Sequence, residues 1–295
     1  MPNKKLVNKI EYYSFRAWLA GFSLLPRCVV RNVLMFLFAA IGYGVGIRKK
    51  VALKQLQKVY PNTAEYKLKT ILKQLYRNMA LMVQEMYLTS DKDLLSMTKI
   101  TGKEHVDEAL SLGRGAILAT AHFGNWEAAR ILPMVGIPLS VITKTQRNKL
   151  FDEYTNELRE RSGLKVINMK RGLRDIIHQL AEGRIVAILM DQNAGKSGLM
   201  MDFLGYPASH WKGVAKISLR YKVPIVTGFA RRVDNGLIQF EFHKPILHEE
   251  LEDCEANYRI VLEEVNQIIE SQIRQYPDQW FWVHKRWKNA YDMFA

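Results

Sequence analysis

The chain has 295 residues, is 48% hydrophobic and carries a formal net charge of +14. This length and apolar content exclude an intrinsically disordered chain and allow a sizeable buried core. The two cysteines, Cys28 and Cys254, lie far apart and outside any Cys/His cluster, so we expect neither a disulfide framework nor a metal site. This cysteine usage is compatible with a reducing, cytosol-facing environment.

The N-terminal segment holds most of the excess charge, because residues 1–58 contain eleven Lys or Arg against one acid, Glu11. The same segment carries two apolar runs, AWLAGFSLLP and NVLMFLFAAIGYGVGI, the second followed by RKK. The second run is slightly shorter than the roughly 18 to 20 residues that span a bilayer comfortably. We interpret residues 1–50 as a membrane anchor, either one tilted span or a hairpin in the interface, with RKK on the cytoplasmic side. A buried core helix is the alternative.

The rest of the chain, residues 51–295, shows helical patterns first and then alternating strands and helices. Residues 62–88 begin with a capping box, Asn62 with Glu65, and predict a long amphipathic helix or a helix pair. Buried strands are predicted for GAILATA, LSVITK, RIVAILMD and PIVTGFA, and an edge-like strand for LIQFEFH. Helical patterns separate them, so we expect an α/β domain with a mixed, largely parallel sheet flanked by helices.

The stretch AHFGNWEAAR places His122 and Glu127 five residues apart. On one continuous helix their side chains would lie roughly 140° apart and could not cooperate. We expect instead that a strand ends at His122, that Gly124 permits a sharp turn, and that Asn125 caps a helix beginning at Trp126. This position is where open α/β sheets usually bind ligands.

Such a turn has a simple chemistry, in which a neutral His122 takes a proton from a hydroxyl while the Glu127 carboxylate orients the ring. The amides at the start of the helix would favour a developing oxyanion. From these residues alone, a satisfied histidine beside an ordinary helix start explains the pattern equally well.

The segment HFGNWE resembles the HxxxxD/E motif of the lysophospholipid-type acyltransferases, and more narrowly the lipid A late acyltransferases. The resemblance covers nearly the whole chain, because RKKVALKQLQKVYPN, RERSG, MDQN and the tail YPDQWFWVHKRWK also match that family. It implies a sandwich like that of the glycerol-phosphate acyltransferases, anchored in the inner membrane with its catalytic domain on the cytoplasmic side.

The resemblance also implies roles for residues and partners. His122 would be the general base and Glu127 its partner, the donor an acyl thioester of acyl carrier protein or coenzyme A, and the acceptor a hydroxyl of a glycolipid such as a lipid A precursor. No cofactor is implied. Candidate substrate-binding residues are Asn125, Arg159, Arg161, Arg171 and Asp191. The three arginines are candidates because guanidinium groups bind phosphate well. A solvated helix face is the structural alternative for Arg159 and Arg161, and a plain turn is the alternative for Asp191.

Two further segments have competing interpretations. The apolar stretch GLMMDFLGYP suits either an acyl-chain groove or core packing. The C-terminal Trp280, Trp282 and Trp287, interleaved with basic residues, fit a membrane interface or a nucleic-acid surface.

Other functions compete with this acyltransferase interpretation. The acceptor could instead be a mannosylated phosphoinositide or a lysophospholipid. A membrane-tethered nucleic-acid-binding protein is disfavoured, because residues 59–295 contribute only +4 of the +14 charge. A catalytically silent scaffold is disfavoured by the complete pair of His122 and Glu127.

Overall fold

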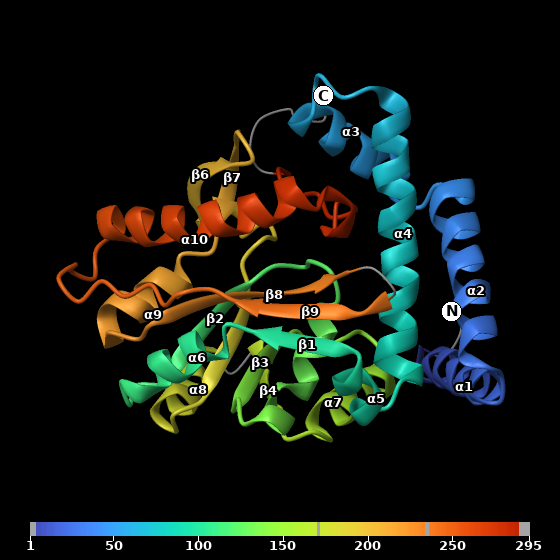
Figure 1. The fold of residues 1–295 in the computed structure, drawn as a ribbon, viewed down its shortest axis with the longest axis horizontal. Helices are drawn as coiled ribbons and strands as arrows, with labels where there is room; N and C mark the ends of the chain where they lie inside the picture. The colour runs from blue at the N-terminus through green and yellow to red at the C-terminus, as the bar shows by residue number, and fades with distance from the viewer. Residues whose placement is uncertain (1–3, 170–171, 234–235, 289–295) are drawn as a thin grey trace.

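The computed structural model describes residues 4–169, 172–233 and 236–288. A seven-stranded sheet lies at its centre in the order β1-β9-β8-β2-β5-β3-β4 (Figure 1). Strands β8, β2, β5, β3 and β4 run parallel, whereas β9 pairs antiparallel with β8 and parallel with β1. The mixed, largely parallel sheet expected from the sequence is therefore confirmed. The strands are β1 (Thr98–Thr101), β2 (Ala116–Thr120), β3 (Leu139–Thr143), β4 (Lys165–Asn168), β5 (Ile185–Leu189), β8 (Ile225–Arg232) and β9 (Ile238–Phe242).

Helices cover both faces of the sheet, and the strand alternation explains how each face is filled (Figure 1). In β2, Ile117 and Ala119 belong to the core beneath α4, α9 and α10, whereas Ala116 and Leu118 belong to the core beneath α5, α6 and η2. The helices are α3 (Lys49–Val59), α4 (Glu65–Leu88), α5 (Asp91–Ser96), α6 (Lys103–Ser111), η2 (Trp126–Val135), α7 (Lys149–Glu160), α8 (Gly172–Ala181), α9 (Gly213–Tyr221) and α10 (Glu255–Gln275), with short 3-10 turns η4 (Gly195–Ser197) and η6 (Pro277–Gln279).

Two local predictions were wrong for identifiable reasons. The LIQFEFH strand, β9, is internal, because β1 adds to the sheet beyond it and forms the edge. No capping box precedes α4: the helix begins at Glu65 after Ala64, which has no side-chain cap, and Asn62 lies in the preceding turn. The segment is one continuous helix that ends at Leu88.

The tryptophan-rich tail is not a membrane belt. Trp280, Trp282 and Trp287 are almost completely buried and join the main core. The apolar stretch after residue 198 forms a separate hairpin, β6 (Leu199–Phe203) with β7 (Tyr206–His210). Leu199, Met201, Phe203 and Leu204 are also buried in that core, whereas Met200 is exposed. Core packing therefore accounts for both segments, since burying aromatic rings stabilises more than exposing them.

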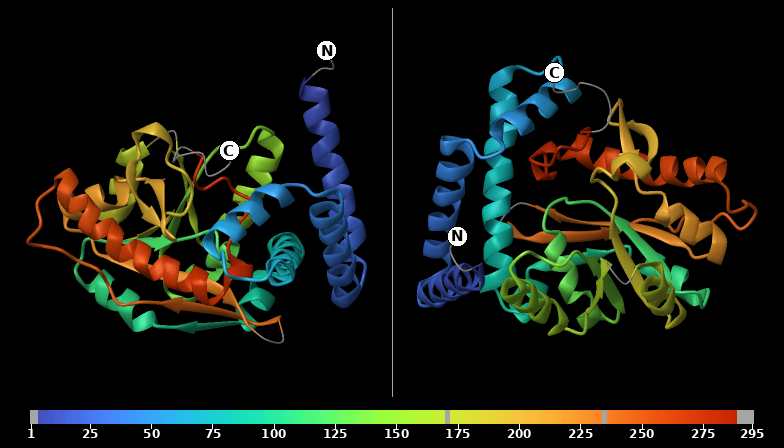
Figure 2. Two further views of the ribbon diagram at one scale, coloured as in Figure 1. Left: turned by 90° about the horizontal axis from the view of Figure 1, so that it is seen from above. Right: turned by 180° about the vertical axis from the view of Figure 1, so that it is seen from behind.

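The N-terminal segment forms α1 (Lys4–Ser23), α2 (Arg27–Phe38) and η1 (Ala39–Val45), a π-helical continuation of α2. Together they make one side of the molecule, separated from the sheet by α4 (Figure 2). The continuous helix from Arg27 to Val45 has 19 residues and a mean hydropathy of 1.8, so by length and composition alone it is able to cross a membrane.

Candidate active site

Two neighbouring parallel strands bring a histidine and a carboxylate together. In the register of β2 and β5, Thr120 lies opposite Leu189, and His122 and Asp191 each follow two residues later. His122 Nδ1 lies 2.9 Å from Asp191 Oδ1. Equal distances beyond paired strand ends therefore place the two side chains at one sheet edge.

The buried Asp191 fixes the tautomer of the histidine. Its Oδ2 accepts a second hydrogen bond, 2.8 Å long, from the indole nitrogen of Trp280. Burial raises the pKa of Asp191, but the charge of His122 and the hydrogen bonds from His122 and Trp280 outweigh it, so the pKa lies below its ordinary value. An ionised carboxylate only accepts hydrogen bonds, so Nδ1 carries the proton and Nε2 keeps its lone pair.

The second ring nitrogen of His122 already has a partner. The Gln192 side-chain amide lies 3.2 Å from Nε2 and, given this tautomer, donates to it. Burial lowers the pKa of His122, but the charge and hydrogen bond of Asp191 and the charge of Glu127 outweigh it, so the pKa lies above its ordinary value. The imidazole of His122 thus has an increased proton affinity, and its unprotonated Nε2 accepts a hydrogen bond from the Gln192 amide.

The HFGN turn is held by backbone contacts from both sides. Gly124 has φ +57, and a Cβ there would lie 2.0 Å from the carbonyl oxygen of Ala230. The Gly124 amide donates to Gln279, the Asn125 amide donates to Ala230, and the carbonyl of His122 accepts from the Phe281 amide. The C-terminal tail thus fixes the backbone that carries the histidine.

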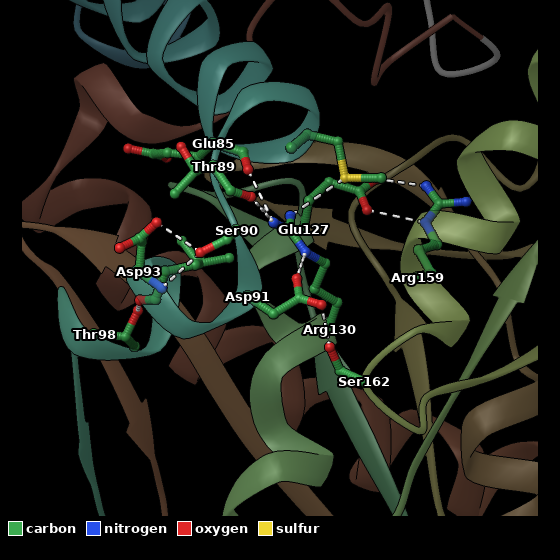
Figure 3. A network of polar contacts seen from close by, with 12 residues as sticks. Glu85, Thr89, Ser90, Asp91, Asp93, Thr98, Glu127, Arg130, Arg159 and Ser162 are labelled. Carbon is green, nitrogen blue, oxygen red and sulfur yellow. Dashed lines mark hydrogen bonds and ion pairs between the residues drawn. The ribbon is translucent and has the colours of Figure 1, made fainter. Parts of the chain in front are cut away.

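Glu127 does not orient the imidazole, which corrects the prediction from the motif. Its carboxylate forms a two-pronged ion pair with Arg159, with distances of 2.5 and 3.0 Å (Figure 3). Glu127 lies in the first turn of the 3-10 helix η2 and pairs with Arg159 of α7, whereas Asp191 lies beside Nδ1 of His122. Glu127 acts on His122 through its charge, which raises the pKa of the imidazole.

A buried arginine holds η2 against the end of α4, in the centre of Figure 3. The Arg130 Nε lies 2.6 Å from a carboxylate oxygen of Asp91, and Nη2 donates to the carbonyls of Glu85 and Thr89 at 3.0 Å each. These fixed contacts position the helix that carries Glu127.

Asn125 is placed by a buried ion pair. Its side-chain amide donates to Glu85 Oε2 at 2.7 Å, and the same carboxylate pairs with Arg232 at 2.6 and 2.8 Å. Its side chain makes no cap hydrogen bond to η2, although its carbonyl accepts from the Ala128 amide. Asn125 is fully buried, so its role is to secure the turn and not, as predicted, to contact substrate.

The four remaining predicted substrate-binding residues have different positions. Arg159 lines the same cavity as His122. Arg161 is exposed, pairs with Glu157 one helical turn away and faces a different hollow beside α1. Arg171 lies outside the described residues. Asp191 is too buried and too fully bonded for the substrate contact predicted for it.

A cavity of about 790 Å³ is lined by His122 together with both polar and apolar side chains. The polar and charged side chains are Glu127, Lys144, Gln146, Asp152, Arg159 and Gln192. The apolar side chains include Leu118, Val141, Ile142, Leu164, Ile167, Ile176, Ile188 and Leu189. A cavity that holds a basic nitrogen and both kinds of lining suits a substrate that has both a polar group and a hydrocarbon chain.

Several residues of this site escaped the sequence analysis. Gln192 directly follows the strand-end Asp191, so the MDQN motif already held a signal for it. Glu85, Arg232 and Trp280 gave none, because each comes from an element distant in sequence that meets the turn only in the folded chain.

Comparison with known proteins identifies the group to which this site belongs. The chain matches the bacterial lipid A biosynthesis acyltransferase family over residues 2–289. It belongs to this family. A lipid A biosynthesis acyltransferase of Haemophilus influenzae is 24% identical over 249 residues, covering 82% of this chain and 76% of that protein. A lipid A biosynthesis palmitoleoyltransferase of Escherichia coli is 22% identical over 291 residues, covering 94% of each.

A shorter match links the chain to another acceptor. A phosphatidylinositol mannoside acyltransferase of Mycobacterium tuberculosis is 29% identical over 126 residues, covering 41% of this chain and 40% of that protein. Two of these relatives are named acyltransferases and the third is named a palmitoleoyltransferase, so the protein is an O-acyltransferase and the family resemblance of HFGNWE is confirmed.

Proposed function

We propose that the enzyme transfers a fatty acyl chain from a thioester of acyl carrier protein to a hydroxyl of a glycolipid such as a lipid A precursor. We place it at the inner membrane, with its catalytic domain on the cytoplasmic side, where acyl carrier protein is available. The observation that carries this proposal is that Nε2 of His122 lies within hydrogen-bond distance of the Gln192 amide, and that both residues line one cavity with charged and apolar side chains. The lipid A acyltransferase relatives support this acceptor.

The reaction follows from the tautomer. When the acceptor hydroxyl replaces the Gln192 amide at Nε2, the imidazole takes its proton while the oxygen attacks the thioester carbonyl. The Asp191 carboxylate stabilises the resulting imidazolium. As the tetrahedral intermediate collapses, the carbon–sulfur bond breaks and the imidazolium returns the proton to the thiolate. The products are an ester and a free thiol, and the chain supplies the only acid and base required.

The displaced Gln192 amide is suited to a second task. It carries two N–H donors beside the reacting atoms, and a donor near a tetrahedral intermediate stabilises its oxyanion. Three amides of the turn do not serve this purpose, since Phe123, Gly124 and Asn125 donate to other carbonyls. We therefore assign the oxyanion contact to the Gln192 side chain.

The test is mass spectrometry of total lipids from cells that express the wild-type chain or His122→Ala at equal levels. We expect a glycolipid heavier by one acyl chain only with the wild type. An active His122→Ala enzyme would refute the mechanism. Purified enzyme given acyl carrier protein or coenzyme A thioesters then identifies the donor.

The acceptor has one alternative with support of its own. The similarity to a phosphatidylinositol mannoside acyltransferase favours a mannosylated phosphoinositide as the second candidate acceptor. A simple lysophospholipid is the third candidate. The mass of the acylated lipid distinguishes all three, because the polar part of each acceptor has a different composition.

A further inference from the structure

We propose that α1, α2 and η1 embed one face of the enzyme in a single anionic lipid leaflet and do not cross the bilayer. This inference rests on the membrane location proposed above and defines how the enzyme reaches the membrane. The membrane face consists of the exposed apolar side chains of these helices and their connections: Leu6, Ile10, Tyr13, Leu24, Leu25, Val29, Phe36, Ile41, Val45 and Ile47.

The long apolar helix is fastened to the catalytic domain near both of its ends. At its start, Arg27 forms an ion pair with Asp93, and its carbonyl accepts a 3.1 Å hydrogen bond from Gln84. Just past its end, the Tyr76 hydroxyl donates to the carbonyl of Ile47 at 2.6 Å. A helix whose two ends contact one water-soluble domain cannot place those ends on opposite sides of a membrane.

Close packing continues between these ends. Val30 and Leu34 of α2 form a small core with Ala80 of α4. Further along, Gly42 lies so close to Tyr76 that a Cβ at this position would be 2.3 Å from the ring. Helix η1 can therefore pack this closely against α4 only because Gly42 has no side chain.

The segment before this helix contacts the same domain. The Asn148 side chain, which caps α7, donates to the carbonyl of Asn8 in α1 at 2.8 Å. The rings of Tyr12 and Phe151 lie 5.7 Å apart, and Phe15 contacts Tyr87 of α4 at 5.1 Å. If the helix from Arg27 to Val45 spanned the bilayer, α1 would lie on the far side and every one of these contacts would be lost.

A span would also carry α4 into the hydrocarbon, because α4 runs alongside α2 (Figure 1). This helix bears charged residues along its length: Glu65, Lys67, Lys69, Lys73, Arg77 and Glu85. Charged side chains inside the hydrocarbon are costly unless they face a protein interior or water. The shared packing of α2 and α4 therefore favours an arrangement in which both stay at the surface of the bilayer.

The shape and charge of this side of the molecule suit an anionic leaflet. Helices α1 and α2 cross at a wide angle on the same side of α4, so their outer faces share one broad surface (Figure 2). Residues 4–45, which form α1, α2 and η1, contain six Lys or Arg and one acid, and this positive charge complements anionic headgroups. Tyr13 is 62% exposed and has the amphipathic side chain favoured at membrane interfaces.

This placement brings the leaflet next to the catalytic cavity. Helix α7 contacts α1 through Phe151 and Tyr154, and the same helix supplies Asp152 and Arg159 to the cavity that contains His122. An acceptor whose hydrocarbon chains remain in the leaflet therefore has a short route to the catalytic base around α7.

Depth-dependent quenching tests the geometry. The two native cysteines are exposed, so Cys28→Ser with Cys254→Ser provides a background for single fluorophores at Ile10→Cys, Phe36→Cys or Val45→Cys. We expect all three probes to be quenched to a similar extent by shallowly brominated lipid in phosphatidylglycerol-containing vesicles, and Ile260→Cys on α10 to remain unquenched. The proposal would be overturned if the probe at residue 36 were quenched only by deeply brominated lipid while the probes at residues 10 and 45 were quenched by shallowly brominated lipid, and if protease on the far side of sealed vesicles digested the N-terminus.

A second pair of variants separates this inference from the catalytic mechanism. Phe36→Glu combined with Val45→Glu should weaken vesicle binding at least tenfold, whereas Ile260→Glu, at an exposed apolar position on α10, should not. Turnover of a detergent-dispersed acceptor should stay unchanged in both, which shows an intact active site. Unaltered vesicle binding by the double variant, or its conversion from a stable dimer to a monomer, would show that lipid does not cover this face.

Discussion

The replacement Asp191→Asn tests the arrangement of the catalytic base most directly. Asn has the same size and keeps an oxygen for the Trp280 indole, but it then presents an amide donor to Nδ1 of His122 in place of a carboxylate. Nδ1 must then accept a hydrogen bond, so the proton moves to Nε2. In this tautomer Nε2 has no lone pair and cannot take a proton from the acceptor.

The expected magnitude follows from this loss. An Asp-to-Asn change that enforces the wrong tautomer in a Ser-His-Asp triad lowers kcat by about 10⁴, and we expect a decrease of about 10³ to 10⁴ here. At about 1.36 kcal/mol per factor of ten, this corresponds to about 4 to 5.5 kcal/mol of transition-state stabilisation. Initial rates of thiol release from an acyl thioester, at saturating acceptor, measure kcat, and circular dichroism melting reports whether the fold is intact.

Glu127→Gln is the matched comparison, because it also replaces a carboxylate by an amide beside the same histidine. Glu127 pairs with Arg159 and not with Nδ1, so this variant keeps the correct tautomer and should retain more activity than Asp191→Asn. The reasoning is refuted if a folded Asp191→Asn enzyme turns over within tenfold of the wild type while Glu127→Gln is inactive. That pattern would make Glu127 the orienting carboxylate.

Three further predictions concern pH and stability. The acidic limb of the pH profile of kcat/KM follows the raised pKa of the His122 imidazole, because the base must be neutral. Glu127→Gln removes a negative charge that raises this pKa, so the acidic limb should move to lower pH. Gln192→Ala removes a hydrogen-bond donor that favours the neutral His122 ring, so the acidic limb should move to higher pH and kcat should fall. An acidic limb at unchanged pH would contradict the hydrogen bond from Gln192 to His122. Glu85→Gln leaves Arg232 buried without its ion pair and should cost about 3 to 5 kcal/mol of unfolding free energy in urea denaturation, whereas Glu65→Gln on the exposed start of α4 should leave the midpoint unchanged.

The sheet was predictable from the sequence because its strands are buried on both faces. Continuous apolar runs such as residues 185–189 leave little alternative to a central strand, and all five predicted runs are strands in the structure. The position of β9 was not predictable, since β1 is a four-residue strand with the sequence TKIT and no apolar run. The tail was misjudged because composition does not distinguish a buried tryptophan from one at a membrane interface.

The site was predictable as far as strand ends determine it. His122 and Asp191 each follow a predicted buried strand, so their common edge could be inferred, and the structure adds that β2 and β5 are neighbours. The order of strands in a sheet is set by long-range packing and is not encoded in the spacing of a motif. The motif therefore suggested Glu127, the nearest carboxylate in sequence, where the fold supplies Asp191.

Hydrogen bonds link helix α3 to the C-terminal tail and the tail to the catalytic centre. Gln55 of α3, which follows the membrane face in sequence, is fully buried. Its side-chain amide donates to the carbonyls of Trp282 and His284, and its side-chain oxygen accepts from the backbone amide of Arg286. The Arg286 guanidinium in turn donates to the carbonyl of Gln192 at 3.0 Å, next to the amide that caps the base. A chain of hydrogen bonds thus runs from α3, through the tail, to Gln192, the residue that the acceptor displaces in the proposed mechanism. Because α3 follows directly from η1, fixing the N-terminal helices at a lipid surface also fixes one end of this chain.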